Sequence, residues 1–145
     1  MTTEVKAAAQ FDAPDAAQQP DLKGAIPYIT AKAGPEQARF YEKAFGAKII
    51  AEMMAEDGKR YMHAHLAING GHLMMSDAFP EHGYAWEEPK NLHIYLPSDN
   101  PQADFDRAVA AGCEVTMPMA VQFWGDRYGQ VKDPYGVTWA IGGPA

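Results

Sequence analysis

Cysteine is nearly absent from this sequence of 145 residues, in which Cys113 is the single example. One cysteine cannot form a disulfide within the chain, so a small secreted domain held together by disulfides is excluded. We interpret Cys113 as a small apolar residue just past a helix rather than as a nucleophile. No neighbouring charge that would lower the pKa of its thiol is visible in the sequence.

Long apolar runs and an excess of positive charge are also missing. No run approaches the roughly 20 apolar residues that a membrane-spanning helix needs, and the first residues lack the charged-then-apolar pattern of a signal peptide. With 12 Lys and Arg against 19 Asp and Glu, the formal net charge is −7, which argues against a nucleic-acid-binding surface. We therefore expect a cytoplasmic protein that has neither a membrane nor a nucleic acid as its partner.

One order of elements occurs twice along the chain. Turns rich in Gly, Pro, Asn and Asp separate short runs of apolar and aromatic residues. The first copy is predicted as a strand over 25–31, a helix over 34–46 and strands over 48–54, 60–68 and 72–76. The second copy is predicted as a strand over 91–96, a helix over 100–112 and strands over 114–118, 123–132 and 137–141. Each copy is therefore a βαβββ module.

The spacing of turn and helix-end residues supports a true repeat. Three pairs are separated by the same 66 positions: Pro35 and Pro101, Gly46 and Gly112, and Gly70 and Gly136. One module cannot bury the apolar face of its sheet alone, so we expect both to form one globular domain of the α+β class. We predict a disordered tail over 1–21, the first module over 22–80, a linker over 81–90 and the second module over 91–145.

Several segments resemble the vicinal oxygen chelate superfamily, which contains glyoxalases, bleomycin-resistance proteins and dioxygenases, and within it the PhnB-like branch. These segments are PYIT (27–30), FYEKAFGA (40–47), MHAHL (62–66), LHIYL (92–96), QFWGDR (122–127) and DPYGVTW (133–139). The resemblance implies paired βαβββ modules that form a cupped mixed sheet around a small-molecule ligand. It also implies a homodimer.

Some members of the PhnB-like branch carry a methyltransferase label. We do not expect this activity here, because the sequence has no glycine-rich strand-to-helix loop of the kind that holds a nucleotide-like cofactor. The expected architecture also lacks a doubly wound sheet.

The resemblance further implies a divalent metal as cofactor, held by the first and last strands of each module in the enzymes of the family. Transfer of those positions to this chain gives Ile26, Met74, Asn91 and Ala140. Three of the four are apolar and none is a carboxylate, whereas a hard divalent ion needs oxygen or imidazole ligands. We therefore expect no metal at the usual family positions and no metal-dependent glyoxalase activity.

Strand alternation places other polar side chains on the face toward the expected pocket. Residues i and i+2 share a face, so His63 and His65 lie with Tyr61, and His93 lies with Tyr95. We predict His63 and His93 as the catalytic residues. The predicted substrate-binding residues are Tyr28, Thr30, His65, Met74, Ser76, Asn91, Tyr95, Trp124, Arg127 and Thr138. Polar groups that converge among apolar walls are typical of a ligand site.

The histidines permit three interpretations. His63, His65 and His93 could together supply three imidazole ligands to a divalent metal. We favour neutral imidazoles that form hydrogen bonds in the pocket without a metal. As a third interpretation, His63 or His93 acts as a general acid or base. His72 and His82 are interpreted as turn or surface residues without a role.

The segment over 124–127 is the remaining candidate. Asp126 and Arg127 could form a structural ion pair, or Arg127 could bind an anionic group of a substrate. Three functions stay open at this level: an enzyme that acts on a small oxygenated metabolite, a protein that sequesters a small molecule, and a scaffold with a vestigial pocket.

Overall fold

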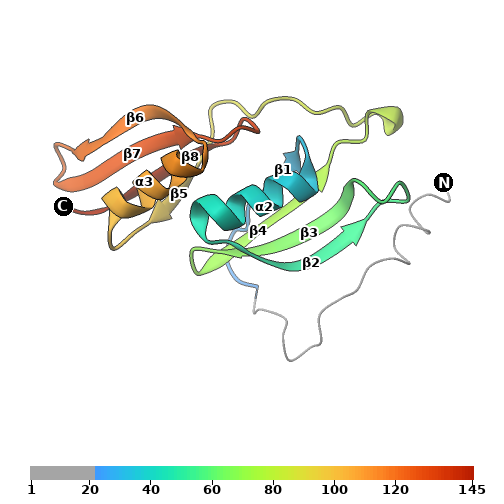
Figure 1. The fold of residues 1–145 in the computed structure, drawn as a ribbon, viewed down its shortest axis with the longest axis horizontal. Helices are drawn as coiled ribbons and strands as arrows, with labels where there is room; N and C mark the ends of the chain where they lie inside the picture. The colour runs from blue at the N-terminus through green and yellow to red at the C-terminus, as the bar shows by residue number, and fades with distance from the viewer. Residues whose placement is uncertain (1–21) are drawn as a thin grey trace. The chain divides into compact units, whose positions relative to one another are not determined.

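The computed structural model describes residues 22–145, so the predicted tail over 1–21 lies outside the described residues. Within the described range the chain divides into two compact units (Figure 1). The first unit comprises residues 22–42 and 47–86, and the second comprises residues 43–46 and 87–145. Neither helix in this range combines the length and apolar character needed to span a membrane.

The first unit is built around a four-stranded mixed sheet. Its elements are β1 (Tyr28–Ala31), α2 (Gly34–Phe45, whose last turn belongs to the second unit), β2 (Lys48–Met54), β3 (Tyr61–Ile68), β4 (Gly71–Asp77) and the 3₁₀ turn η2 (Pro80–His82). The strand order is β1-β4-β3-β2. β1 runs parallel to β4, and the other two pairs are antiparallel.

The second unit repeats this arrangement. Its elements are β5 (His93–Pro97), α3 (Pro101–Ala111), β6 (Glu114–Val121), β7 (Asp126–Lys132) and β8 (Thr138–Pro144). The strand order is β5-β8-β7-β6, again with one parallel pair, β5 and β8. The two predicted βαβββ modules and their mixed sheets are confirmed.

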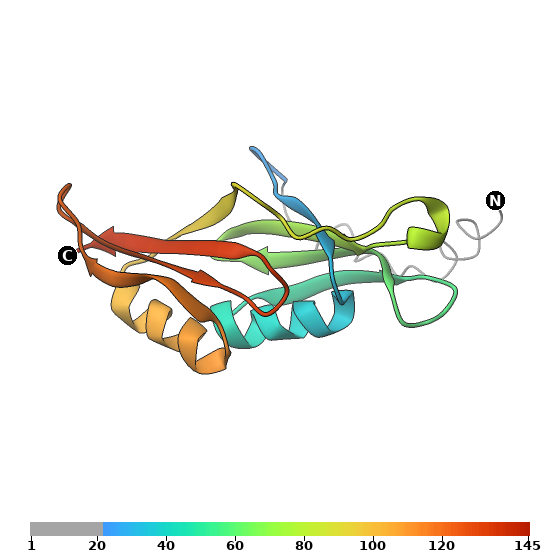
Figure 2. The same ribbon diagram turned by 90° about the horizontal axis from the view of Figure 1, so that it is seen from above.

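Each helix lies along one face of a sheet and buries an apolar stripe there (Figures 1 and 2). In α2 the buried residues Ala38, Tyr41 and Ala44 follow at three-residue steps, which is the spacing of one helical face. In α3 the buried Phe105 and Ala108 have the same spacing. The other face of each sheet is therefore not covered by the helix of the same unit.

The ends of the helices confirm the signals seen in the sequence. Asn100 caps α3 by accepting a hydrogen bond from the backbone N–H of Ala103, and Pro101 occupies the first helical turn. Gly46 and Gly112 follow the two helices with φ of 68° and 129°, a backbone region that favours glycine.

Two buried carboxylates tie loops to strands. Asp133 accepts hydrogen bonds from the backbone N–H of Tyr135 and Val137 and from the indole N–H of Trp139, at 2.8 to 3.0 Å. Asp77 has a corresponding role in the first unit. Such carboxylates satisfy backbone donors that burial would otherwise leave without partners.

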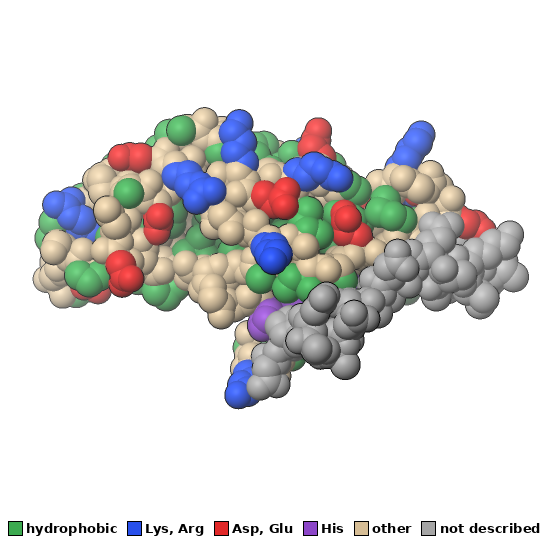
Figure 3. Space-filling view, turned by 60° about the horizontal axis from the view of Figure 1, so that its bottom comes forward, with side chains coloured by type: hydrophobic (Ala, Val, Ile, Leu, Met, Phe, Trp, Pro, Cys, Tyr) green, Lys and Arg blue, Asp and Glu red, His purple; other side chains and the backbone are tan. Residues whose placement is uncertain are grey.

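Charged side chains of both signs share the surface. On the face shown in Figure 3, Lys and Arg side chains are interspersed with Asp and Glu side chains and do not form one basic patch. This distribution is consistent with the negative net charge of the chain.

Several predicted boundaries were wrong. Ile26 and Asn91 precede β1 and β5 instead of lying in them, and Asn91 has φ 57°, which no strand residue adopts. β6 continues to Val121 instead of ending at residue 118, and residues 123–125 lie in the turn before β7 rather than in a strand. The alternation of apolar and polar residues predicted the strand boundaries correctly only where the backbone is regular.

Candidate functional site

The first unit contains a cleft of about 600 Å³ next to the end of β4. Met62, Phe79 and Tyr84 supply apolar and aromatic surface to its walls. Thr30 and Ser76, which lie opposite each other on β1 and β4, supply hydroxyl groups. A cleft of this volume, with apolar walls and a few polar groups, is typical of a site for a small organic molecule.

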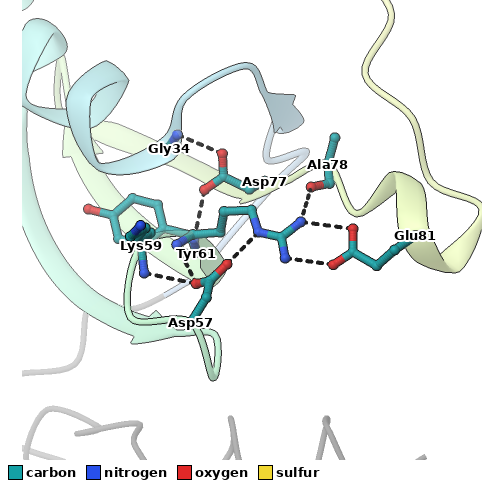
Figure 4. A network of polar contacts seen from close by, with 8 residues as sticks. Gly34, Asp57, Lys59, Tyr61, Asp77, Ala78 and Glu81 are labelled. Carbon is teal, nitrogen blue, oxygen red and sulfur yellow. Dashed lines mark hydrogen bonds and ion pairs between the residues drawn. The ribbon is translucent and has the colours of Figure 1, made fainter.

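Arg60 contacts the wall of this cleft that residues 78–84 form, through hydrogen bonds to Ala78 and Glu81, both labelled in Figure 4. Its guanidinium donates to Asp57 at 2.7 Å and to both carboxylate oxygens of Glu81 at 3.0 and 2.6 Å. It also donates to the carbonyl of Ala78 and lies 4.3 Å from the centre of the Phe79 ring. A bidentate pair of this kind fixes geometry as well as charge.

Arg60, Asp57 and Glu81, here called the Arg60 cluster, stabilise one another in the ionised state. Backbone and side-chain hydrogen bonds, from Lys59 and Arg60, lower the pKa of Asp57 to about 2. The hydrogen bonds from Arg60 lower the pKa of Glu81 to about 2. The guanidinium is therefore already occupied by two carboxylates, so it serves to position the wall rather than to attract an anion.

Asp77 closes the base of the cleft at the end of β4 (Figure 4). Its two carboxylate oxygens accept hydrogen bonds from the backbone N–H groups of Gly34 and Tyr61, each at 2.7 Å. Burial raises the pKa of Asp77, although both hydrogen bonds act in the opposite direction. Asp77 thereby joins the start of α2, the start of β3 and the end of β4.

Tyr28 and His63 form a hydrogen-bonded pair on the same face of the sheet as Ser76. The phenol oxygen and the imidazole Nδ1 are 2.8 Å apart. Burial raises the pKa of Tyr28, with an opposing contribution from a hydrogen bond with the Ser76 side chain. Burial lowers the pKa of His63, so its imidazole is neutral at pH 7. A neutral imidazole beside a phenol can accept, hold or return a proton.

His65 and His72 form a second pair on this face. His65 Nε2 and His72 Nδ1 are 3.1 Å apart, and His65 is only 8% exposed. Burial lowers the pKa of His65, and repulsion by the positive forms of His72 and His63 lowers it further. His72 does not lie in a turn, as the sequence suggested: it lies within β4 and contacts the imidazole of His65.

The second unit carries its own polar cluster, on the face that α3 leaves uncovered. His93 is paired with Thr138 in the β5–β8 register, and its Nε2 lies 3.5 Å from the Tyr128 hydroxyl. That hydroxyl accepts a hydrogen bond from Gln130 at 3.0 Å. The ring of Tyr95 stacks on the ring of Tyr128 with centroids 6.1 Å apart.

The two clusters occupy matching places in the repeat. Tyr28 lies opposite Met74 in the first sheet, as Tyr95 lies opposite Ala140 in the second. Each of these tyrosines meets a ring from the third strand of its module, His63 in one case and Tyr128 in the other. The repeat therefore places a tyrosine-centred pair in each unit, with a different partner.

Within each unit the structure brings together most of the predicted substrate-binding residues. The first unit gathers Tyr28, Thr30, His63, His65, Met74 and Ser76 on neighbouring strands of one sheet. The second gathers His93, Tyr95 and Thr138, and Trp124 meets Tyr128 edge to face at 5.6 Å. Because His63 and His93 belong to different units, their joint catalytic role remains a prediction.

Of the two alternatives left open for Arg127, the ion pair with Asp126 does not occur in residues 22–145, since neighbouring strand residues point to opposite faces. Two predictions about individual side chains were wrong. Asn91 lies outside the strand that was expected to carry it. Tyr61 does not share the face of His63: it is fully buried, it contacts Gly34 at the start of α2, and its hydroxyl bonds to Glu52.

The reason for the change at Tyr61 is a bulge. Met53 pairs with His63 but Met54 pairs with Tyr61, so Met62 is an extra residue in β3, and an extra residue in a strand reverses the alternation beyond it. Met62 consequently lines the cleft in place of Tyr61.

Arg60 and Tyr128 were missed as site residues from the sequence. Arg60 lies in the turn before β3 instead of in the strand predicted over 60–68, and alternation gives no information about direction in a turn. Tyr128 could have been predicted, because it shares a strand face with Gln130, two residues further along β7. In the structure Tyr128 pairs with Gly142 of β8 and Gln130 pairs with Ala140.

The residues present do not fit the divalent metal that the resemblance implies. The paired positions at the centre of the two parallel strand pairs hold Tyr28 and Met74 in one unit and Tyr95 and Ala140 in the other. A phenol, a thioether and a methyl group are poor ligands for a hard cation. In the described part of the chain no group of three or more His, Cys, Asp or Glu side chains could hold a metal ion, so His63, His65 and His93 do not form such a group.

Comparison with known proteins identifies relatives across most of the chain. The family model described as the Glyoxalase/Bleomycin resistance protein/Dioxygenase superfamily matches residues 29–141. An uncharacterized protein from Mycobacterium tuberculosis is 36% identical over 124 residues, which cover 81% of this chain and 72% of the relative.

Solved structures show the same fold. Protein PA1353 from Pseudomonas aeruginosa is 27% identical, with a TM-score of 0.69 over 84% of this chain and 98% of that protein. A PhnB protein from Bacillus cereus is 19% identical, with a TM-score of 0.63 over 86% and 99%.

Proposed function

Because the chain belongs to the glyoxalase/bleomycin resistance protein/dioxygenase superfamily, we propose that it binds a small organic molecule in the cleft of its first unit. The observation that carries this proposal is the cleft itself, with a volume of about 600 Å³ and the aromatic residues Phe79 and Tyr84 in its walls. Tyr84 is 71% exposed, so apolar surface there is available to a ligand. Burial of that surface would supply the binding free energy.

The position of the Arg60 cluster indicates which part of a ligand meets which wall. Asp57 and Glu81 are both paired with Arg60, so the fastened wall offers little free charge to an anion. Thr30 and Ser76 add hydroxyl groups to the lining that can form hydrogen bonds. We therefore expect a ligand with an apolar or aromatic body and a neutral polar group.

The test is a fluorescence titration with the neutral probe N-phenyl-1-naphthylamine. We expect saturable binding of one probe per chain, and loss of that binding in Met62→Trp, since the larger side chain fills the cleft. Val109→Trp is the matched control, because it adds the same side chain at an exposed position on α3 of the second unit. Equal affinity in Met62→Trp and the parent protein would contradict the proposal.

A second candidate function is acid–base catalysis by His63, and the Tyr28–His63 hydrogen bond favours it. With Nδ1 accepting from the Tyr28 phenol, neutral His63 carries its proton on Nε2 and would donate it to a bound metabolite, while Nδ1 takes up the phenol proton. The experiment follows small oxygenated metabolites by mass spectrometry after incubation with the protein. Turnover that is lost in His63→Asn and reduced in Tyr28→Phe, but kept in Tyr135→Phe, supports an enzyme. Tight binding without any turnover leaves sequestration as the function.

We also propose a homodimer. The resemblance to dimeric family members supports it, as do exposed apolar side chains on and just after β6, among them Val115, Val121 and Phe123. Exposed strand edges and apolar patches are common sites of association. A sedimentation mass equal to one chain at micromolar concentration would contradict this proposal. A cytoplasmic location is likewise a proposal, and it rests on the sequence.

A further inference from the structure

We propose that His65 and His72 form a chelating site for a borderline transition-metal dication, of the class of Cu²⁺, Ni²⁺ and Zn²⁺. Both residues lie in the first unit, on the adjacent antiparallel strands β3 and β4. Neither lines the cleft, and neither is at a position where the family metal is expected. The proposal is therefore independent of the small-molecule site.

The geometry of the pair suits one shared ion. His65 Nε2 and His72 Nδ1 are 3.1 Å apart. With metal–nitrogen bonds of about 2.05 Å, two nitrogens at this separation subtend an angle of about 98° at the metal. That angle falls between the right angle of octahedral and square-planar complexes and the wider angle of a tetrahedral one.

The backbone limits the motion of both ligands. His65 is 8% exposed and stands in the centre of β3, between β2 and β4. Its direct partner in β4 is Met74, and His72 is two positions from Met74 on the same face. A pair held on two hydrogen-bonded strands loses little conformational entropy when it binds a metal, which favours chelation over adventitious surface binding.

The protonation state of the pair also suits a metal. A metal binds only the unprotonated nitrogen of an imidazole. In the His65–His72 hydrogen bond one of the two facing nitrogens carries a proton, which must move to the other nitrogen of the same ring when the ion enters. Both rings then remain neutral, and no proton is lost from the pair.

The ligand chemistry selects the class of metal. Two imidazoles favour Cu²⁺ over Ni²⁺ and Zn²⁺ in the usual order of stability, whereas Mg²⁺ and Ca²⁺ require oxygen ligands. Met74, with a thioether on the same face, adds no ligand for a hard ion. Water would fill the remaining positions around the metal.

The test is calorimetric titration of the untagged full chain, freed of metal, with Cu²⁺, Ni²⁺, Zn²⁺ and Mg²⁺ salts. We expect one ion of Cu²⁺ per chain, weaker Ni²⁺ and Zn²⁺ binding, and no response to Mg²⁺. Affinity for Cu²⁺ should fall at least tenfold in His72→Ala. It should not change in His82→Ala, which removes an exposed histidine from η2 of the same unit.

A spectroscopic measurement counts the imidazole ligands directly, so a change in the stability of the variant does not affect its interpretation. Electron spin echo modulation of the Cu²⁺ complex should show two coupled imidazoles in the parent protein and one in His72→Ala. The proposal is overturned if no Cu²⁺, Ni²⁺ or Zn²⁺ binds at millimolar concentration, or if His72→Ala binds Cu²⁺ within twofold of the parent. It is also overturned if the parent complex shows fewer than two imidazoles.

Discussion

Tyr28 and His63 are separated by 35 positions in the sequence, yet the phenol oxygen of one lies 2.8 Å from Nδ1 of the other. Their strands, β1 and β3, are not neighbours, because β4 runs between them. The two side chains therefore meet above β4, on the face that also carries Met74 and Ser76. This contact exists only because β1 pairs in parallel with the last strand of its module.

We expect Tyr28→Phe to raise the pKa of His63. The phenol keeps its proton at neutral pH, since burial raises its pKa, and as a donor to Nδ1 it stabilises the neutral imidazole. Removal of the hydroxyl leaves only burial to lower the pKa of His63. Titration of the histidine ring protons by NMR measures this change, with Tyr135→Phe as the control. An unchanged His63 titration would show that the phenol does not donate to this nitrogen.

Stability should decrease as the pH falls below about 6.5, the ordinary pKa of histidine. The pKa values of His63 and His65 are lowered in the folded protein, so between the folded and unfolded values the unfolded chain binds more protons. The free energy of unfolding then decreases with decreasing pH. Urea unfolding between pH 7.5 and 5.5 measures the effect.

His63→Asn should reduce this pH dependence, because it removes one of the two histidines. The Arg60 cluster does not contribute in this range, since the pKa values of Asp57 and Glu81 are about 2. A pH dependence of the same size in the variant would contradict the assignment.

Gly34→Ala should destabilise the protein by about 1 to 3 kcal/mol, the usual cost of an overpacked site. A Cβ at Gly34 would lie 2.7 Å from Cδ2 of Tyr61 and would collide with the Asp77 carboxylate. Gly71→Ala is the matched control, because its nearest atom, the carbonyl oxygen of Ile68, is 3.6 Å away. We expect the control to change the free energy of unfolding by less than about 1 kcal/mol. Denaturant titration of both variants distinguishes them.

Cys113 should react slowly with thiol reagents in the folded protein. It is 6% exposed, and burial raises the pKa of its thiol to about 12, with a further contribution from the charge of Asp133. The thiolate, which is the reactive form, is therefore rare at pH 8. We expect the reaction with Ellman's reagent to be complete only after unfolding in guanidinium chloride. Rapid reaction of the folded protein would contradict the buried position.

Arg60→Met should loosen the wall of the cleft without unfolding the unit. The change removes the ion pairs to Asp57 and Glu81 and keeps a long side chain. Hydrogen exchange at the amides of Gly83 and Tyr84, which bond to the carbonyls of Pro80 and Phe79, should become faster. The amides of β7 in the second unit serve as the internal reference. Unchanged exchange at both positions would show that the turn over residues 79–84 keeps its structure without Arg60.

Much of the fold could be predicted from local signals. Pro35, Gly46, Pro101 and Gly112 mark helix ends because backbone geometry restricts what can stand there. The 66-residue spacing then revealed the duplicated module before any contact was known. The same local rules predicted the uncovered face of the first sheet and placed His63 and His65 on it.

Local signals failed where the backbone departs from regular geometry. The positive φ of Asn91 prevents the predicted strand from beginning there, and the bulge at Met62 near the start of β3 exchanges the faces of Tyr61 and Met62. Neither irregularity can be recognised in a single sequence, because Asn and Met also occur where the backbone is regular.

The sequence by itself determined the number and order of the elements, the repeat and the family, since each of these depends on neighbours within a few residues or on a fixed spacing. Only the tertiary structure decided that His65 meets His72, that Tyr28 reaches His63 above β4, and that Arg60 holds the wall of a cleft. The reason is physical: strand register and turn geometry set which distant side chains come within hydrogen-bond distance, and both depend on the packing of the whole sheet.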